Sequence, residues 1–139
     1  MIQSLAAVNW LAVLVATAVL YALGGLWYSP ALFGPRWRAG VGFAPPEGWK
    51  PRPLLYLAPL LGCLVVTIAT ALLVMFTDAH SLRDGATLGL IVGLGYGAAI
   101  AGVDATAPSH PRPGTLALVT GAYWTVGITL VAMILSVWG

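Results

Sequence analysis

The sequence predicts an all-α integral membrane protein: a bundle of four transmembrane helices with an interfacial segment in its first loop. Three observations predict this class. Hydrophobic residues make up 60% of the 139-residue chain, charged residues make up only 7%, and the mean hydropathy is +0.93. A soluble domain has about 25% charged residues. In a bilayer, by contrast, lipid solvates the outer surface and only the helix ends need polar groups.

Four apolar segments are long enough to cross a membrane, which takes about 20 helical residues. None of them contains a lysine, arginine or glutamate. Because little polar sequence lies between them, we expect a single transmembrane domain over residues 1–139. The expected helices are 5–28, 54–76, 85–103 and 115–138.

The first helix follows a segment without lysine or arginine, so it lacks the basic region of a signal peptide and we expect it to be retained. Its one amide, Asn9, has two interpretations: a hydrogen bond to a neighbouring helix, or part of a substrate site. The helix ends in the stretch GGLWYSPALFGPRW, residues 24–37. Gly24 and Gly25 would allow close approach of another helix, and Ser29-Pro30 would end or redirect the helix.

The aromatic residues of this stretch suit the headgroup level of a bilayer, where amphipathic rings are favoured. Phe33 and Trp37 alternate with Arg36 and Arg38, a pattern typical of an interfacial segment on an anionic leaflet. The following PEGWKPRP run is too rich in proline for a helix. Pro59 either marks the true start of the second helix or kinks it.

The third helix carries the clearest packing pattern. SLRD, residues 81–84, is similar to a capping box that would open it. Small residues then recur every four positions, which predicts a glycine zipper on one helix face. Two interpretations stay open: close contact with another helix of the same chain, or contact between copies in a homo-oligomer. The packing residues are Gly85, Gly89, Gly93, Gly97 and Ala101.

The basic residues predict the orientation, because short loops rich in lysine and arginine stay cytoplasmic. The first and third loops together hold five of the six bases, whereas the second loop holds only Arg83. We therefore expect a multi-pass protein of the bacterial inner membrane with both termini on the non-cytoplasmic side.

Candidate chemistry is sparse. The acids are Glu47, Asp78, Asp84 and Asp104; the first three lie in loops, and Asp104 is expected at the interface as a solvated or capping residue rather than a proton carrier. His80 and His110 lie in loops expected on opposite faces, and the single Cys63 lies in an apolar run, where we expect it to be inert. We therefore expect no enzyme activity, no catalytic residues, no metal, no cofactor and no nucleic-acid partner.

The two ends of the chain strongly resemble a family of small bacterial membrane proteins, domain of unknown function 1761. The resemblance depends on Asn9-Trp10, Gly25, the WYSP motif at residues 27–30 and FG followed by Trp37, and on Arg-Pro followed by Gly121 and Tyr123. This chain departs from the family pattern in its third loop and at Trp124, where a histidine is common. The resemblance implies four transmembrane helices and supplies no activity. The candidate interface or binding residues are Asn9, Trp10, Trp27, Tyr28, Ser29, Pro30, Phe33, Gly34, Trp37 and Tyr123.

Two functional hypotheses follow. The first is a non-enzymatic accessory or scaffold subunit that acts through helix packing, with the lipid bilayer and a larger membrane complex or a homo-oligomer as partners. The alternative is a small oligomeric transporter or channel for a small molecule or lipid, with a path lined by Asn9, Thr17, Tyr21 and Tyr123. A transporter would have a polar cavity that reaches the middle of the bilayer.

Overall fold

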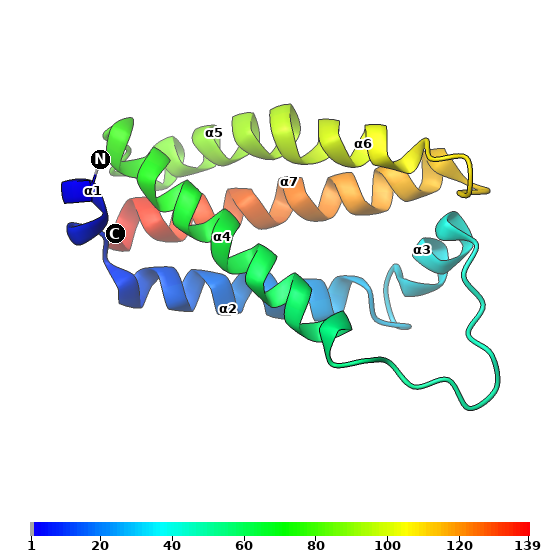
Figure 1. Ribbon diagram of the computed structural model, residues 1–139. Helices are drawn as coiled ribbons and strands as arrows, with labels where there is room; N and C mark the ends of the chain where they lie inside the picture. Colours follow the sequence, from blue (N-terminus) through cyan, green and yellow to red (C-terminus); the bar gives the residue numbers. More distant parts are fainter. Residues whose placement is uncertain (1) are drawn as a thin grey trace.

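The computed structural model describes residues 2–139, and every regular element in that range is a helix. Four helical stretches are long and apolar enough to cross a membrane, which confirms the predicted fold class. Figure 1 shows them as long, roughly aligned rods, with α4 crossing the others diagonally. The elements are α1 (Ile2–Ala6), α2 (Trp10–Trp27), α3 (Gly34–Val41), α4 (Leu54–Phe76), α5 (Leu82–Val92), the π-helix η1 (Gly93–Ala98), α6 (Ala99–Ala105) and α7 (Pro113–Trp138).

Three helix starts differ from the expected boundaries: α7 begins at Pro113 rather than residue 115, and capping side chains explain the other two. The first long helix begins at Trp10 rather than residue 5, because Asn9 is extended and its side chain accepts a hydrogen bond from the N–H of Ala12. The third begins at Leu82 rather than residue 85, because the hydroxyl of Ser81 accepts from the N–H of Asp84. The SLRD motif thus opens the helix through its Ser81 cap, while the Asp84 carboxylate accepts from the Ser81 hydroxyl.

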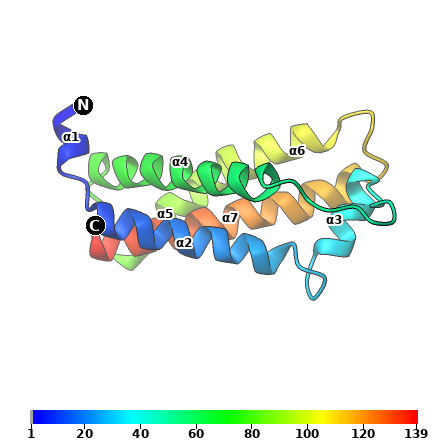
Figure 2. The same ribbon diagram turned by 60° about the horizontal axis from the view of Figure 1, so that its bottom comes forward.

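The helix α7 is the centre of the bundle. It is the most buried of the four spans and contacts α2, α3, α4 and the continuous α5–η1–α6 helix. Figures 1 and 2 both show it between α2 and the α5–α6 helix. Pro113 occupies the first turn of α7, where its missing N–H costs no helical hydrogen bond.

The small-residue face of the third span packs on α7 of the same chain. A Cβ atom added to Gly85 would lie 2.7 Å from the carbonyl oxygen of Ala132, and one added to Gly93 would lie 2.8 Å from the Cα of Thr125. Such distances leave no room for a side chain, so the two backbones are in direct contact. A Cβ added to Gly97 would lie 2.8 Å from the side-chain Cβ of Trp124. The contact therefore matches the first of the two interpretations of this face.

The π-helix keeps this four-residue repeat on one face. In an α-helix, residues four apart are rotated by about 40° beyond a full turn, so a stripe from Gly85 to Ala101 would drift by roughly 160°. A π turn holds more residues and rotates less per residue, which offsets part of the drift. Gly93 lies at the start of η1 and is buried, and Ala101 and Ala105, beyond it, are buried too.

The connections gather at two ends of the bundle. The first loop, α3 and the connection before α7 lie at one end, and both termini and the α4–α5 connection lie at the other (Figure 1). We call the first of these the loop-one end. Pro59 lies inside α4, so it does not mark the start of that helix.

Candidate functional site

A tight reversal follows α2 and is built from backbone hydrogen bonds. The N–H of Phe33 donates to the carbonyl of Trp27 at 2.9 Å, and the N–H of Gly34 donates to the carbonyl of Ser29 at 3.1 Å. Gly34 is buried, and a Cβ there would lie 2.7 Å from that same carbonyl oxygen. A glycine is therefore required at the point where the chain folds back into α3.

The helix α3 is attached to α7 and to the connection before it. A Cβ on Gly40 would lie 3.0 Å from the Cβ of Leu116, and the N–H of Arg112 donates to the carbonyl of Gly40 at 3.4 Å. Gly42 has a left-handed φ of 73° and ends α3 beside Pro111. Figure 2 shows α3 beside the start of α7. The expected interfacial segment thus packs against the protein itself as well as facing outward through its exposed arginines.

The aromatic side chains of the reversal meet an aromatic residue of α7. The ring of Tyr28 lies edge-on to Trp37 at 6.1 Å and to Tyr123 at 5.4 Å. Trp27 lies 4.8 Å from Phe33 and 6.3 Å from Tyr123. Separations of 4.5–7 Å are the favourable range for tilted aromatic pairs. We call these five residues the aromatic cluster.

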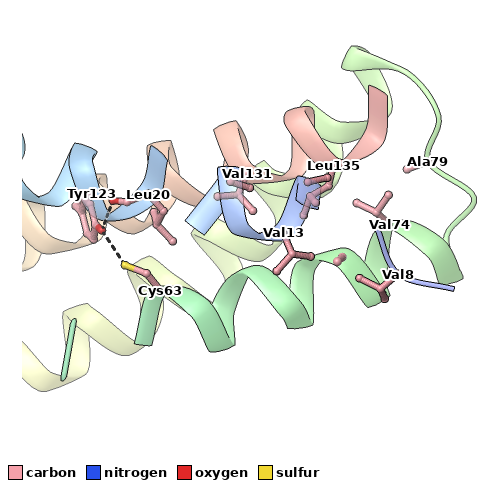
Figure 3. Close-up of a cluster of buried hydrophobic side chains, with 12 residues drawn as sticks. Val8, Val13, Leu20, Cys63, Val74, Ala79, Tyr123, Val131 and Leu135 are labelled. Atoms are coloured by element: carbon pink, nitrogen blue, oxygen red, sulfur yellow. Dashed lines mark hydrogen bonds between the residues drawn. The ribbon is translucent and has the colours of Figure 1, made fainter. Parts of the chain in front are cut away.

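The polar tips of the cluster bind backbone carbonyls of neighbouring helices. The indole N–H of Trp27 donates to the carbonyl of Val119 at 2.9 Å, and the hydroxyl of Tyr123 donates to the carbonyl of Leu20 at 2.9 Å. The thiol of Cys63 lies 3.7 Å from the same hydroxyl (Figure 3). Tyr123 therefore joins α2, α4 and α7 at one buried point.

The structure divides the predicted site residues between the two ends of the bundle. Trp27, Tyr28, Phe33, Trp37 and Tyr123 come together, with Gly34 and Ser29 forming the turn beneath them, whereas Pro30 is exposed. Asn9 and Trp10 lie at the other end. The side-chain N–H of Asn9 donates to the carbonyl of Trp138 at 3.1 Å, so its polar partner is the last turn of α7. Of the two interpretations of Asn9, the hydrogen bond to a neighbouring helix matches this contact.

Several residues of the site were not predicted. The Leu20 and Val119 carbonyls receive the cluster's two hydrogen bonds, and backbone acceptors carry no signal in a sequence. Gly24 belongs to a glycine pair that the sequence displays as a possible packing site. A Cβ on it would lie 2.9 Å from the Tyr123 hydroxyl, so Gly24 is part of the site. Gly25 has no atom within 4 Å of an added Cβ, so among the described residues only Gly24 of the pair meets a neighbouring helix.

The arrangement is neutral and hydrogen-bonded rather than acid–base in character. The Arg36 guanidinium lies 6.0 Å from the centre of the Phe33 ring, at the limit of a cation–π contact. Over residues 2–139, no three His, Cys, Asp or Glu side chains are grouped closely enough to hold a metal ion. His80 pairs with Asp78 at 2.7 Å. This pair lies in the α4–α5 connection, at the opposite end of the bundle from the aromatic cluster.

A family model described as "Protein of unknown function (DUF1761)" matches residues 11–136. The match covers nearly the whole chain and includes both the reversal and Tyr123. No curated protein and no solved structure matches the chain.

Proposed function

This chain belongs to the family of proteins of unknown function DUF1761, and from that premise we propose that it is a non-enzymatic accessory or scaffold subunit of a membrane complex. In this role the buried half of the aromatic cluster fixes the shape of the loop-one end. The exposed half of the same segment then contacts a protein partner.

One observation carries this proposal: three of the predicted site residues join helices through side-chain hydrogen bonds. Trp27 and Tyr123 donate to carbonyls of other helices, and Asn9 donates to the last turn of α7. The Tyr123 contact is buried, the Trp27 contact is partly buried and the Asn9 contact is exposed. Each donor already has a protein partner, and such bonds specify how helices pack. This favours a protein whose interior is devoted to packing and whose outer surface carries the function.

The contacts of the predicted transport path support the same choice. The Thr17 hydroxyl donates to the Val13 carbonyl one turn earlier, and the Tyr21 hydroxyl donates to the Tyr56 carbonyl at 3.1 Å. Thr67 and Thr125 also bond one turn back on their own helices. A transport path would need such hydroxyls directed at a polar cavity.

The outer face of residues 28–42 is the surface that we propose for the partner. Leu32 is 45% exposed, and Pro30, Arg36 and Arg38 are exposed beside it. Arginine is enriched in protein interfaces relative to the rest of the surface, and Leu32 adds exposed apolar area to the same segment.

The test is affinity purification of the tagged full chain from its own membranes in mild detergent, followed by mass spectrometry. We expect a stoichiometric protein partner that is lost from the Leu32→Ser/Arg36→Ser variant and retained by a Leu118→Ser control, whose side chain is also exposed but lies on α7. Recovery of lipid alone, or equal loss of the partner from both variants, would contradict the proposal.

A further inference from the structure

A groove of about 830 Å³ lies beside the first turns of α4 at the loop-one end. One wall is apolar and comes from a membrane-spanning helix. The rim comes from the extended segment that precedes this helix and carries two cations. The lining residues are Trp49, Lys50, Arg52, Leu54, Leu55, Ala58 and Pro59.

The groove is open because no other helix in the described part of the chain covers the side chains along the first two turns of α4, which meets α2 there through the Tyr21 hydroxyl and the Tyr56 carbonyl. Leu54 is 65% exposed and Leu61 is 52% exposed, whereas burial of α4 begins at Cys63. Figure 1 shows α4 running diagonally, so that its start lies beside α2 and away from the α5–α6 helix. Prolines 51 and 53 prevent the preceding segment from joining the helix, so it stays extended along the groove.

The charge at the rim is positive and has no counter-charge within the groove. Lys50 and Arg52 are exposed, and among residues 2–139 neither forms an ion pair with a carboxylate within 4 Å. Glu47 is the one acid in the first loop, against four bases. The first turn of α4 contains no acidic residue.

We propose that this groove binds one anionic phospholipid. The phosphate lies between Lys50 and Arg52, and an acyl chain runs along Leu54, Leu55 and Pro59. This geometry fits a lipid because cations lie where a spanning helix begins, which is the headgroup level, and an apolar wall continues toward the hydrocarbon. Trp49, 42% exposed at the rim, also suits that level. The site is separate from the surface proposed above for a protein partner.

The test compares lipid adducts of the full chain by native mass spectrometry in mild detergent, with phosphatidylglycerol and phosphatidylcholine of identical acyl chains as probes. We expect the wild-type chain to retain phosphatidylglycerol preferentially. The Lys50→Gln/Arg52→Gln variant should lose this preference by about tenfold, because it removes the two cations that line the groove and would bond the phosphate directly. The matched control, Arg36→Gln/Arg38→Gln, removes the same charge at the same end and should keep the preference.

A second variant tests the apolar wall. Ala58→Trp leaves both cations in place and fills the groove, and we expect it to reduce retention of phosphatidylglycerol while the thermal unfolding midpoint stays unchanged. Equal retention of the two lipids by the wild-type chain, equal loss from both charge variants, or unchanged binding to Ala58→Trp would each overturn the proposal. Displacement of the lipid by inorganic phosphate alone would overturn it as well, because it would indicate a phosphate site that does not use the acyl chain.

Discussion

The hydroxyl of Tyr123 donates a hydrogen bond to the carbonyl of Leu20, and this 2.9 Å contact joins the last spanning helix to the first. Both side chains are almost fully buried, with Leu20 1% and Tyr123 5% exposed. The hydroxyl passes over Gly24, where a Cβ would lie only 2.9 Å from it. The contact thus depends on a glycine one turn beyond the carbonyl that it serves.

Replacing Gly24 by leucine should therefore destabilise the bundle, whereas the same change at Gly25 should not. The new side chain at position 24 must displace the buried Tyr123 ring, and overpacking of this kind costs about 1–3 kcal/mol. Position 25 is exposed, with open space around an added Cβ. Circular dichroism during unfolding of both variants in detergent measures the difference in their stability. Equal stability of the two would show that the Tyr123 contact does not constrain the helix pair.

Removing the hydroxyl alone should have a smaller effect. Tyr123→Phe loses one interhelical hydrogen bond, which is worth about 1 kcal/mol in a membrane protein. It also removes the atom nearest to the new side chain in Gly24→Leu, so the double variant should be more stable than the sum of the two single costs implies. A double-mutant cycle checks this coupling, and strictly additive costs would contradict the geometry.

The packing of the third span on α7 gives a second matched pair. Gly93→Leu places a side chain against the Thr125 backbone, which cannot move without separating the helices, and we expect loss of several kcal/mol or failure to fold. Gly95→Leu, two residues away, points into open space and should be tolerated. Size-exclusion chromatography would report the oligomeric state of each variant, and unfolding would report its stability. If Gly93→Leu changed only the oligomeric state and left the monomer stable, the same-chain contact would not be the main one.

The two tryptophans that open and close α2 should respond differently to replacement by leucine. Trp27 loses its hydrogen bond to Val119 and its contact with Phe33, so Trp27→Leu should cost about 1–3 kcal/mol. Trp10 is 46% exposed on a spanning helix, and Trp10→Leu should be nearly neutral. Thermal unfolding of both variants in the same detergent compares them. A neutral Trp27→Leu would return this residue to the role of a simple interfacial anchor.

The four spans could be predicted because hydropathy and proline placement act locally along the chain. The helix starts at Trp10 and Leu82 depend on the capping side chains of Asn9 and Ser81, which the sequence also displays. The π-helix could not be predicted, because it results from keeping the small-residue face on α7 over several turns. That requirement involves two helices, and neither sequence segment contains it alone.

The candidate site was predicted in part for a related reason. The aromatic residues of the reversal share one short stretch, so they could be selected together. Their convergence with Tyr123, almost a hundred residues later, depends on tertiary packing of α7 against α2. Resemblance to a family selected Tyr123 but also selected Asn9 and Trp10, which lie at the opposite end. The residues selected by the family resemblance therefore lie at two different ends of the bundle and do not form one site.

The division into two ends also allows the predicted orientation in the membrane to be tested. Five of the six bases lie in the first and third loops, and both loops lie at the loop-one end, opposite the two termini. Because basic loops stay cytoplasmic, an alkaline phosphatase reporter fused after Gly139 should be active and one inserted after the exposed Gly48 should be inactive. A fluorescent reporter that matures only in the cytoplasm should show the reverse pattern at the same two positions. The opposite result would place Lys50 and Arg52 on the outer leaflet and require another explanation for the charge asymmetry.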